Sequence, residues 1–124
     1  MTFIQTPDAP APGGHYSQAV VHNGLVYLSG ILPITASGQK LADASVAEQT
    51  EQILANLDAI LKASGSQRTN VLKVTVYVSD ISAWGTVNQL YTQFFGDLRP
   101  ARSVVPVGPL HYGLSIELEA IATI

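Results

Sequence analysis

Ser115-Ile116-Glu117-Leu118-Glu119-Ala120-Ile121, close to the end of the 124-residue chain, alternates apolar and polar side chains. A period of two predicts a β-strand with one apolar face and one face that carries two glutamates. Upstream, Arg102-Ser103-Val104-Val105-Pro106-Val107 predicts a second strand. We expect the Arg102 guanidinium to lie within reach of Glu119 or Glu117. Such a contact is either a structural ion pair, which spacing alone favours, or part of a functional site.

The composition predicts one domain that spans residues 1–124, long enough to bury a hydrophobic core. Hydrophobic residues make up 47% of the chain and charged residues only 12%, below the usual share of roughly a quarter. A surface this poor in charge suggests that another subunit covers part of it. The net charge is −3 and the six lysines and arginines are scattered, so nucleic acid is not an expected partner.

Cysteine is absent, which excludes disulfides, thiolate catalysis and cysteine metal sites. The first residues, Met1-Thr2-Phe3-Ile4-Gln5, lack the basic segment and long apolar run of a secretory signal. No apolar run approaches the length of a membrane span. We therefore expect a cytoplasmic protein that does not bind a membrane.

Turn and capping signals organise the first half of the chain. After an irregular segment at 6–15, two β-prone runs flank Asn23-Gly24, the pair that best supports the type I′ turn of a hairpin. Ser45 and Glu48 have the spacing of a capping box, which predicts a helix that ends at Ser64-Gly65. The expected inner face of this helix consists of Val46, Ile53, Leu57, Ile60 and Leu61.

The second half predicts a strand over 72–78 with Leu72 on its apolar face, and then a helix that Asp80 or Ser82 begins. That helix stops at Gly96, and its expected inner face consists of Trp84, Val87, Tyr91, Phe94 and Phe95. The element order is β-β-α-β-α-β-β. Two helices can cover only one face of such a mixed sheet, so we expect an α+β domain whose second sheet face is buried against copies of itself.

Isolated residues give weaker signals. The three histidines, His15, His22 and His111, lack metal-ligand spacing and are expected to be structural. Ser29 lacks the context of a nucleophile elbow, and no phosphate-binding loop occurs. An arginine that grips a carboxylate with two parallel hydrogen bonds, beside a glutamate that orients water, would suit a small carboxylate substrate that reacts with water.

Five segments together resemble the Rid (YjgF) family of enamine/imine deaminases, in the right order and spacing from end to end. They are 14–19 (GHYSQA), 27–33 (YLSGILP), 86–95 (TVNQLYTQFF), 100–103 (PARS) and 116–122 (IELEAIA). The resemblance implies a chorismate-mutase-like α+β fold and a homotrimer with a site at each subunit interface. It also implies hydrolysis of reactive 2-enamine and 2-imino acids, such as 2-aminoacrylate released by pyridoxal-phosphate enzymes, to 2-keto acids and ammonia. No cofactor or metal is implied.

The same resemblance assigns roles to residues. Arg102 matches the arginine that binds the substrate carboxylate, and Glu119 matches the glutamate that positions water. The implied pocket residues are Tyr16, Ser29, Gly30, Asn88 and Tyr91, with Val104 at a position where the family often has cysteine and the backbone carbonyl can serve. Pro106 also replaces a glutamate common in the family, and the segment 96–99 is short. These departures bear on the preference for the substrate side chain.

Three alternatives stay open at this point. The enzyme could act on a related catabolic intermediate, such as an aminomuconate or a product of pyrimidine breakdown. The chain could bind small carboxylates without catalysis, because the arginine clamp suffices for that. RNA binding or cleavage has been attached to some relatives, and the acidic net charge counts against it.

Overall fold

The computed structural model describes all residues, 1–124, as one six-stranded mixed sheet with two helices. The strands are β1 (Thr2–Ile4), β2 (Ala19–His22), β3 (Leu25–Ile31), β4 (Val71–Val78), β5 (Ala101–Pro106) and β6 (Ile116–Thr123). The helices are α1 (Val46–Ala63) and α2 (Trp84–Phe95), and three short 3-10 turns are η1 (Arg68–Asn70), η2 (Ile81–Ala83) and η3 (His111–Gly113). The strand order across the sheet is β1-β2-β3-β6-β4-β5.

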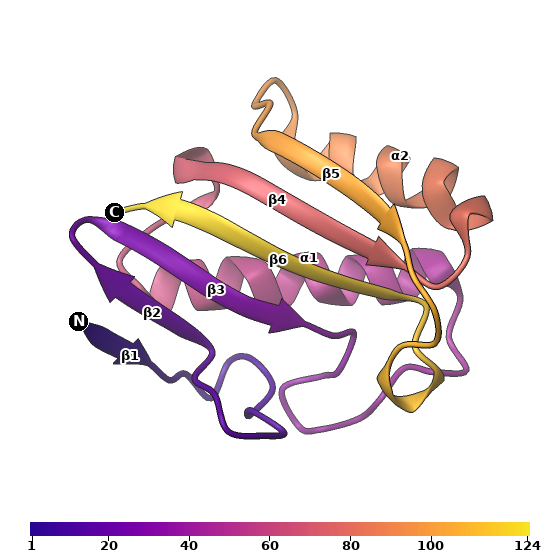
Figure 1. Cartoon of the computed structure of the whole chain (residues 1–124), viewed down its shortest axis with the longest axis horizontal. Helices are drawn as coiled ribbons and strands as arrows, with labels where there is room; N and C mark the ends of the chain where they lie inside the picture. The colour runs from indigo at the N-terminus through magenta and orange to yellow at the C-terminus, as the bar shows by residue number, and fades with distance from the viewer.

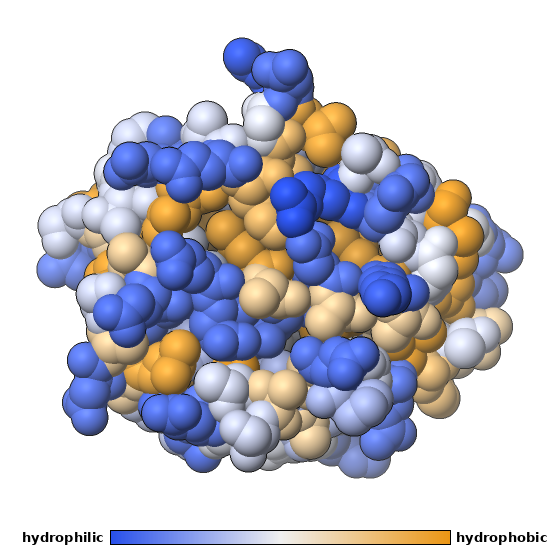
Figure 2. Space-filling view, turned by 180° about the vertical axis from the view of Figure 1, so that it is seen from behind, coloured by the Kyte–Doolittle hydropathy of each residue, from blue (hydrophilic) through white to orange (hydrophobic).

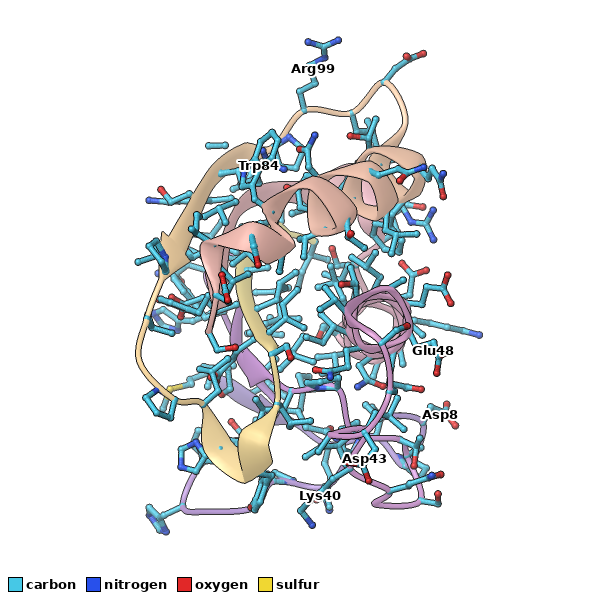
Figure 3. The ribbon with its side chains drawn as sticks, turned by 90° about the vertical axis from the view of Figure 1, so that its right-hand side faces the viewer. Asp8, Lys40, Asp43, Glu48, Trp84 and Arg99 are labelled. Atoms are coloured by element: carbon cyan, nitrogen blue, oxygen red, sulfur yellow. The ribbon has the colours of Figure 1, made fainter.

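Both helices lie on one face of the sheet, behind it in Figure 1, and leave the other face uncovered within the chain. The side view in Figure 3 shows the same layering, with α1 seen end-on and α2 above it. The predicted α+β class and the order of the seven main elements are therefore confirmed. The sequence prediction missed β1, a short edge strand paired with β2.

The local signals in the first half act as predicted. Asn23 and Gly24 both have positive φ, 50° and 77°, as the hairpin between β2 and β3 requires. The Ser45 side chain accepts a hydrogen bond from the Glu48 backbone N–H at 3.1 Å and caps α1. Gly65 follows the helix with φ of 77°, a conformation that favours glycine.

One core cluster fills the space between the sheet and the helices. Strand β6 contributes the alternate residues Ile116, Leu118, Ala120 and Ala122, all buried there. Glu117 and Glu119 therefore point to the uncovered face, as the period of two predicts. Seen from the helix side, hydrophilic residues cover much of the surface, with hydrophobic residues between them (Figure 2). No helix in the structure is both long and apolar enough to cross a bilayer.

Two residues predicted on inner faces are exposed. Leu72 is 48% exposed, because the pairing of β4 with β6 shifts register between Val71 and Lys73 and turns Leu72 outward. Trp84, the first residue of α2, is 44% exposed and lies beside β5 in Figure 3. Val87, Tyr91 and Phe95 form the buried face of that helix, as predicted.

The placement of β5 corrects one expectation. Strand β5 pairs in parallel with β4, and β4 lies between β5 and β6. Arg102 is in register with Val74, whose side chain is buried on the helix-covered side. Glu117 and Glu119 lie two strands away on the opposite face, so an ion pair between Arg102 and either glutamate of the same chain is excluded.

Candidate functional site: two half-sites in one chain

A cavity of about 550 Å³ opens at the end of β3. Its walls come from the segment 10–16, the strand end and loop at 29–40, and η3 with the start of β6. The lining residues used below are Tyr16, Ser29, Gly30, Lys40, His111, Tyr112 and Glu117. The cavity therefore brings together three of the predicted pocket residues, Tyr16, Ser29 and Gly30, and one of the two candidate glutamates.

A β-bulge shapes the floor of this cavity. Leu28 pairs with Ala120 and Ile31 pairs with Leu118, so Ser29 and Gly30 together oppose one residue of β6. The Ser29 hydroxyl donates to the Ser17 carbonyl at 2.6 Å, which fixes its side chain. Gly30 leaves room for the Glu117 carboxylate, since a Cβ built there would lie 2.2 Å from Glu117 Oε1. The bulge and the glycine thus place a carboxylate directly beside backbone.

The Glu117 carboxylate is half-buried, and burial raises its pKa above the ordinary carboxyl value. The positive charge of His111 opposes this rise, and the negative charge of Glu119 adds to it. No hydrogen bond within the chain occupies Glu117. Its lone pairs are therefore available to a water or a ligand in the cavity.

Glu119 has a different environment. Its Oε1 accepts a hydrogen bond from the Tyr77 hydroxyl, and this bond raises the pKa of that tyrosine. Glu119 lines a separate hollow of about 290 Å³ on the uncovered sheet face, together with Lys73 and Thr75. The structure therefore does not bring Glu119, the glutamate that the family resemblance assigned to water, into the cavity with Ser29 and Gly30.

The remaining predicted residues gather on the other side of the sheet, between β5 and α2. Arg102 Nη1 donates to Asn88 Oδ1 at 2.9 Å, and the Arg102 guanidinium carbon lies 4.7 Å from the centre of the Tyr91 ring. Val104 follows on the same face of β5 and is half-buried. Because the amide and the ring fix one side of the guanidinium, its other N–H groups remain free to bind a carboxylate.

Tyr91 carries an unsatisfied polar atom. Its hydroxyl oxygen is buried and has no hydrogen-bond partner in the chain. Burial raises the pKa of Tyr91 to about 12, although the neighbouring Arg102 charge lowers it. A buried hydroxyl without a hydrogen-bond partner is uncommon and costs stability.

The sequence analysis assigned no site role to four residues that line the cavity: Gln18, Lys40, His111 and Tyr112. Gln18 is buried and anchors the segment 6–10, since its side chain forms hydrogen bonds with the Thr6 backbone and donates one to the Pro10 carbonyl. These bonds indicate a structural role. The other three come from loops, where no periodicity marks a residue as facing a cavity. No group of three histidine, aspartate or glutamate side chains is arranged to hold a metal ion.

Gly30→Ala tests the close approach at the bulge. The added methyl would meet the Glu117 carboxylate at 2.2 Å, and a flexible side-chain end can move away. We expect the fold to survive and the activity that depends on Glu117 to fall by roughly 10-fold or more, because small misplacements of a reacting group have large effects. Melting temperature and turnover measured on one preparation check this.

Gly85→Ala is the matched control, since a Cβ at this helical position meets nothing within 4 Å. It should keep full activity and stabilise α2 slightly. An active Gly30→Ala protein would show that the Glu117 carboxylate is not held for a reaction.

Comparisons with known proteins agree with this architecture. The sequence model described as endoribonuclease L-PSP matches residues 6–124. The chain is 45% identical over 119 residues to the 2-iminobutanoate/2-iminopropanoate deaminase of Rattus norvegicus, covering 96% of this chain and 87% of that protein. It is 43% identical over 121 residues to the chloroplastic Reactive Intermediate Deaminase A of Arabidopsis thaliana, covering 98% of this chain and 65% of that protein.

Solved structures give the same result. The crystal structure of RidA from the Antarctic bacterium Psychrobacter sp. PAMC 21119 superposes with a TM-score of 0.95 at 35% identity, over 100% of both chains. E. coli TdcF with bound serine superposes with a TM-score of 0.94 at 34% identity, over 100% of this chain and 99% of that one. The chain belongs to the Rid family, whose sequence model is described as endoribonuclease L-PSP.

Proposed function

We propose that this protein is a 2-enamine/2-imino acid deaminase, which hydrolyses reactive imines to 2-keto acids and ammonia. Three relatives at 43–45% identity are named 2-iminobutanoate/2-iminopropanoate deaminase, and a fourth, at 43%, is named Reactive Intermediate Deaminase A. The observation that carries the proposal is the pair of half-sites: an arginine prepared to bind a carboxylate, and an unpaired carboxylate in a cavity. Catalysis of 2-imino acid hydrolysis can use both of these groups and requires no redox partner.

The arginine half-site binds the substrate carboxylate in this proposal. Asn88 and the Tyr91 ring hold Arg102 in one orientation, so a carboxylate can accept two parallel hydrogen bonds from its free N–H groups. The carbonyl of Val104, two residues further along the strand, is the acceptor proposed for the amino end of the substrate.

The carboxylate half-site activates water. We assign this role to Glu117 and not to Glu119, because Glu117 lies in the cavity free of hydrogen bonds while Tyr77 occupies Glu119. Glu117 would take a proton from a water as the water adds to the imine carbon. The Ser29-Gly30 bulge would hold the substrate against the carboxylate.

The two half-sites belong to different subunits in this proposal. Within one chain they lie on opposite faces of the sheet, so a complete site needs a second copy to bring its Glu117 to the first copy's Arg102. The unpartnered Tyr91 hydroxyl and the uncovered sheet face support an interface at both places. Cyclic closure of such a head-to-tail contact gives the homotrimer that the family resemblance implies.

The test couples activity to assembly. 2-Iminopropanoate and 2-iminobutanoate are generated by an amino-acid oxidase, and the release of keto acid and ammonia is followed with and without the protein. We expect a rate above the spontaneous one, and a light-scattering mass of three 13.1 kDa chains. A binder without catalysis would leave the spontaneous rate unchanged, and a monomer would remove the composite site.

RNA cleavage is the rival, because the description of the matching family names an endoribonuclease. The net charge of −3 disfavours it, since RNA binding rests on cations that neutralise phosphates. Cleavage of a single-stranded RNA at physiological salt, unaffected by Glu117→Gln, would support that rival. A cytoplasmic location stays a prediction, and the Arabidopsis thaliana relative is named as chloroplastic.

A further inference from the structure

His111 lies at the wall of the 550 Å³ cavity, on the turn that precedes β6. Two successive residues with positive φ, Tyr112 at 61° and Gly113 at 70°, form this turn and return the chain to Glu117. A tyrosine in the left-handed region is strained, and such strain collects at functional sites. The strained turn holds the imidazole on the same cavity as the Glu117 carboxylate.

The titratable groups that line the cavity together with His111 are Tyr16, Lys40, Tyr112 and Glu117. Glu117 of β6, Tyr16 of the segment before β2 and Lys40 of the loop after β3 line the same cavity, and Figure 3 shows Lys40 close to η3. The Lys40 ammonium stacks 4.6 Å from the centre of the Tyr112 ring, and the His111 and Tyr112 rings lie 5.9 Å apart. His111 has no hydrogen bond to Glu117, although its charge acts on that carboxylate.

The proposed reaction needs a second proton-transfer group. When water adds to a neutral imine, the electron pair of the C=N bond moves to nitrogen, which must gain a proton. Glu117 is the base for water and cannot donate at that moment. Imidazole is the side chain whose ordinary pKa lies nearest neutrality, which suits a donor that must also recover its proton. A lysine ammonium, whose ordinary pKa lies far above neutrality, is less suited to this role than an imidazole.

We propose that His111 is the proton donor to the imine nitrogen, acting across the cavity from Glu117. This inference rests on the proposed deaminase function. In the first step the C–O bond forms and the C=N π bond breaks; Glu117 takes a proton from water and His111 gives one to nitrogen. In the second step Glu117 returns its proton to the amine, the C–N bond breaks and ammonia leaves. The carbinolamine hydroxyl proton passes to His111, so both residues are restored.

Both residues then influence the dependence of turnover on pH. Glu117 must be ionised, so turnover falls as the pH drops through its raised pKa. His111 must hold the proton that it donates, so its replacement should change the dependence of turnover on pH. An alkaline limb that belongs to the substrate's own iminium ion would be common to all variants. A difference between variants therefore isolates the contribution of His111.

The experiment measures kcat/KM for 2-iminobutanoate between pH 5 and 9 on the wild type, His111→Gln and His22→Gln. His22 lies at the hairpin end of β2, outside the cavity, and serves as the matched control. We expect His111→Gln to lose on the order of 10²-fold, the lower end of general-acid effects, with a flatter alkaline limb and an unchanged acid limb. His22→Gln should match the wild type.

A second variant separates proton transfer from structure. His111→Ala opens space for a free imidazole in the cavity, so added imidazole should restore part of its turnover, and a structural histidine would not be rescued this way. A His111→Gln protein with the wild-type rate and pH profile would overturn the inference, as would a His111→Ala protein that imidazole does not rescue. Absence of turnover in the wild type itself would refute the proposed function instead.

Discussion

Glu117→Gln is expected to lower imine turnover by on the order of 10²-fold or more, because the amide keeps the shape of the side chain and removes the base. The substrate carboxylate binds elsewhere, so KM should change much less than kcat. The measurement is keto-acid formation from 2-iminobutanoate at saturating substrate. Trimer mass on the same preparation shows that assembly is intact.

Stability should move in the opposite direction to activity. Burial raises the pKa of Glu117 in the folded chain above its ordinary value of 4.5, so the native state binds more protons than the unfolded state just above that pH. Stability is therefore lost as the pH rises from about 4.5 through the raised pKa. A neutral glutamine avoids this loss, and we expect the melting temperature of Glu117→Gln at pH 7 to equal or exceed that of the wild type.

Glu119→Gln is the matched control, because Glu119 lies two residues further along β6 on the same strand face. It changes the acceptor of the Tyr77 hydroxyl and should affect stability or assembly more than kcat. The family resemblance by itself favoured Glu119 as the residue that positions water. A severe loss in Glu119→Gln together with a mild one in Glu117→Gln would restore that assignment.

Arg102→Lys should lose most deamination, roughly 10²-fold, while it keeps the fold and some affinity for carboxylates. A lysine attracts a carboxylate as a point charge, and only the planar guanidinium holds it in one orientation with two bonds. Misplacement by about 1 Å suffices for a loss of this size. If Arg102→Lys instead has a lower melting temperature and turns over imine at the wild-type rate, the role of Arg102 is only structural.

Mixed assemblies test whether the two half-sites come from different subunits. Co-expressed Glu117→Gln and Arg102→Ala chains supply an intact arginine and an intact glutamate, respectively. In a head-to-tail ring assembled at random from equal amounts, about a quarter of the interfaces combine both intact residues. We expect activity near that fraction of wild type. If one chain supplied both residues, every site would lack one of them and the mixture would stay inactive.

Much of the fold followed from local signals in the sequence. The Asn23-Gly24 turn and the Ser45 cap each depend on a few neighbouring residues, and both appear as predicted. The predictions that were wrong concern positions whose structure depends on residues far away in the sequence. Leu72 turns outward because of a register shift against β6, and β5 joins the edge of the sheet beside β4, which no local period encodes.

The site was predictable in its residue types and less so in its arrangement. Asn88, Tyr91 and Arg102 do lie together, and so do Tyr16, Ser29 and Gly30. Alternation placed both glutamates on one face and could not choose between them. Two features of the structure decide between them. The bulge at 29–30 places Gly30 beside the Glu117 carboxylate, and the Tyr77 hydroxyl, from a strand far away in the sequence, donates a hydrogen bond to Glu119.

Because the site is divided between two faces of one sheet, catalysis should depend on the concentration of the protein. A dissociated chain would carry every required side chain and still hold no site, so specific activity should decline on dilution even though each chain stays folded. A small carboxylate that bridges two subunits would counteract this decline, because ligands that bind only the assembled form shift the equilibrium towards it. The amount of working enzyme would then rise with the supply of the compound that it removes.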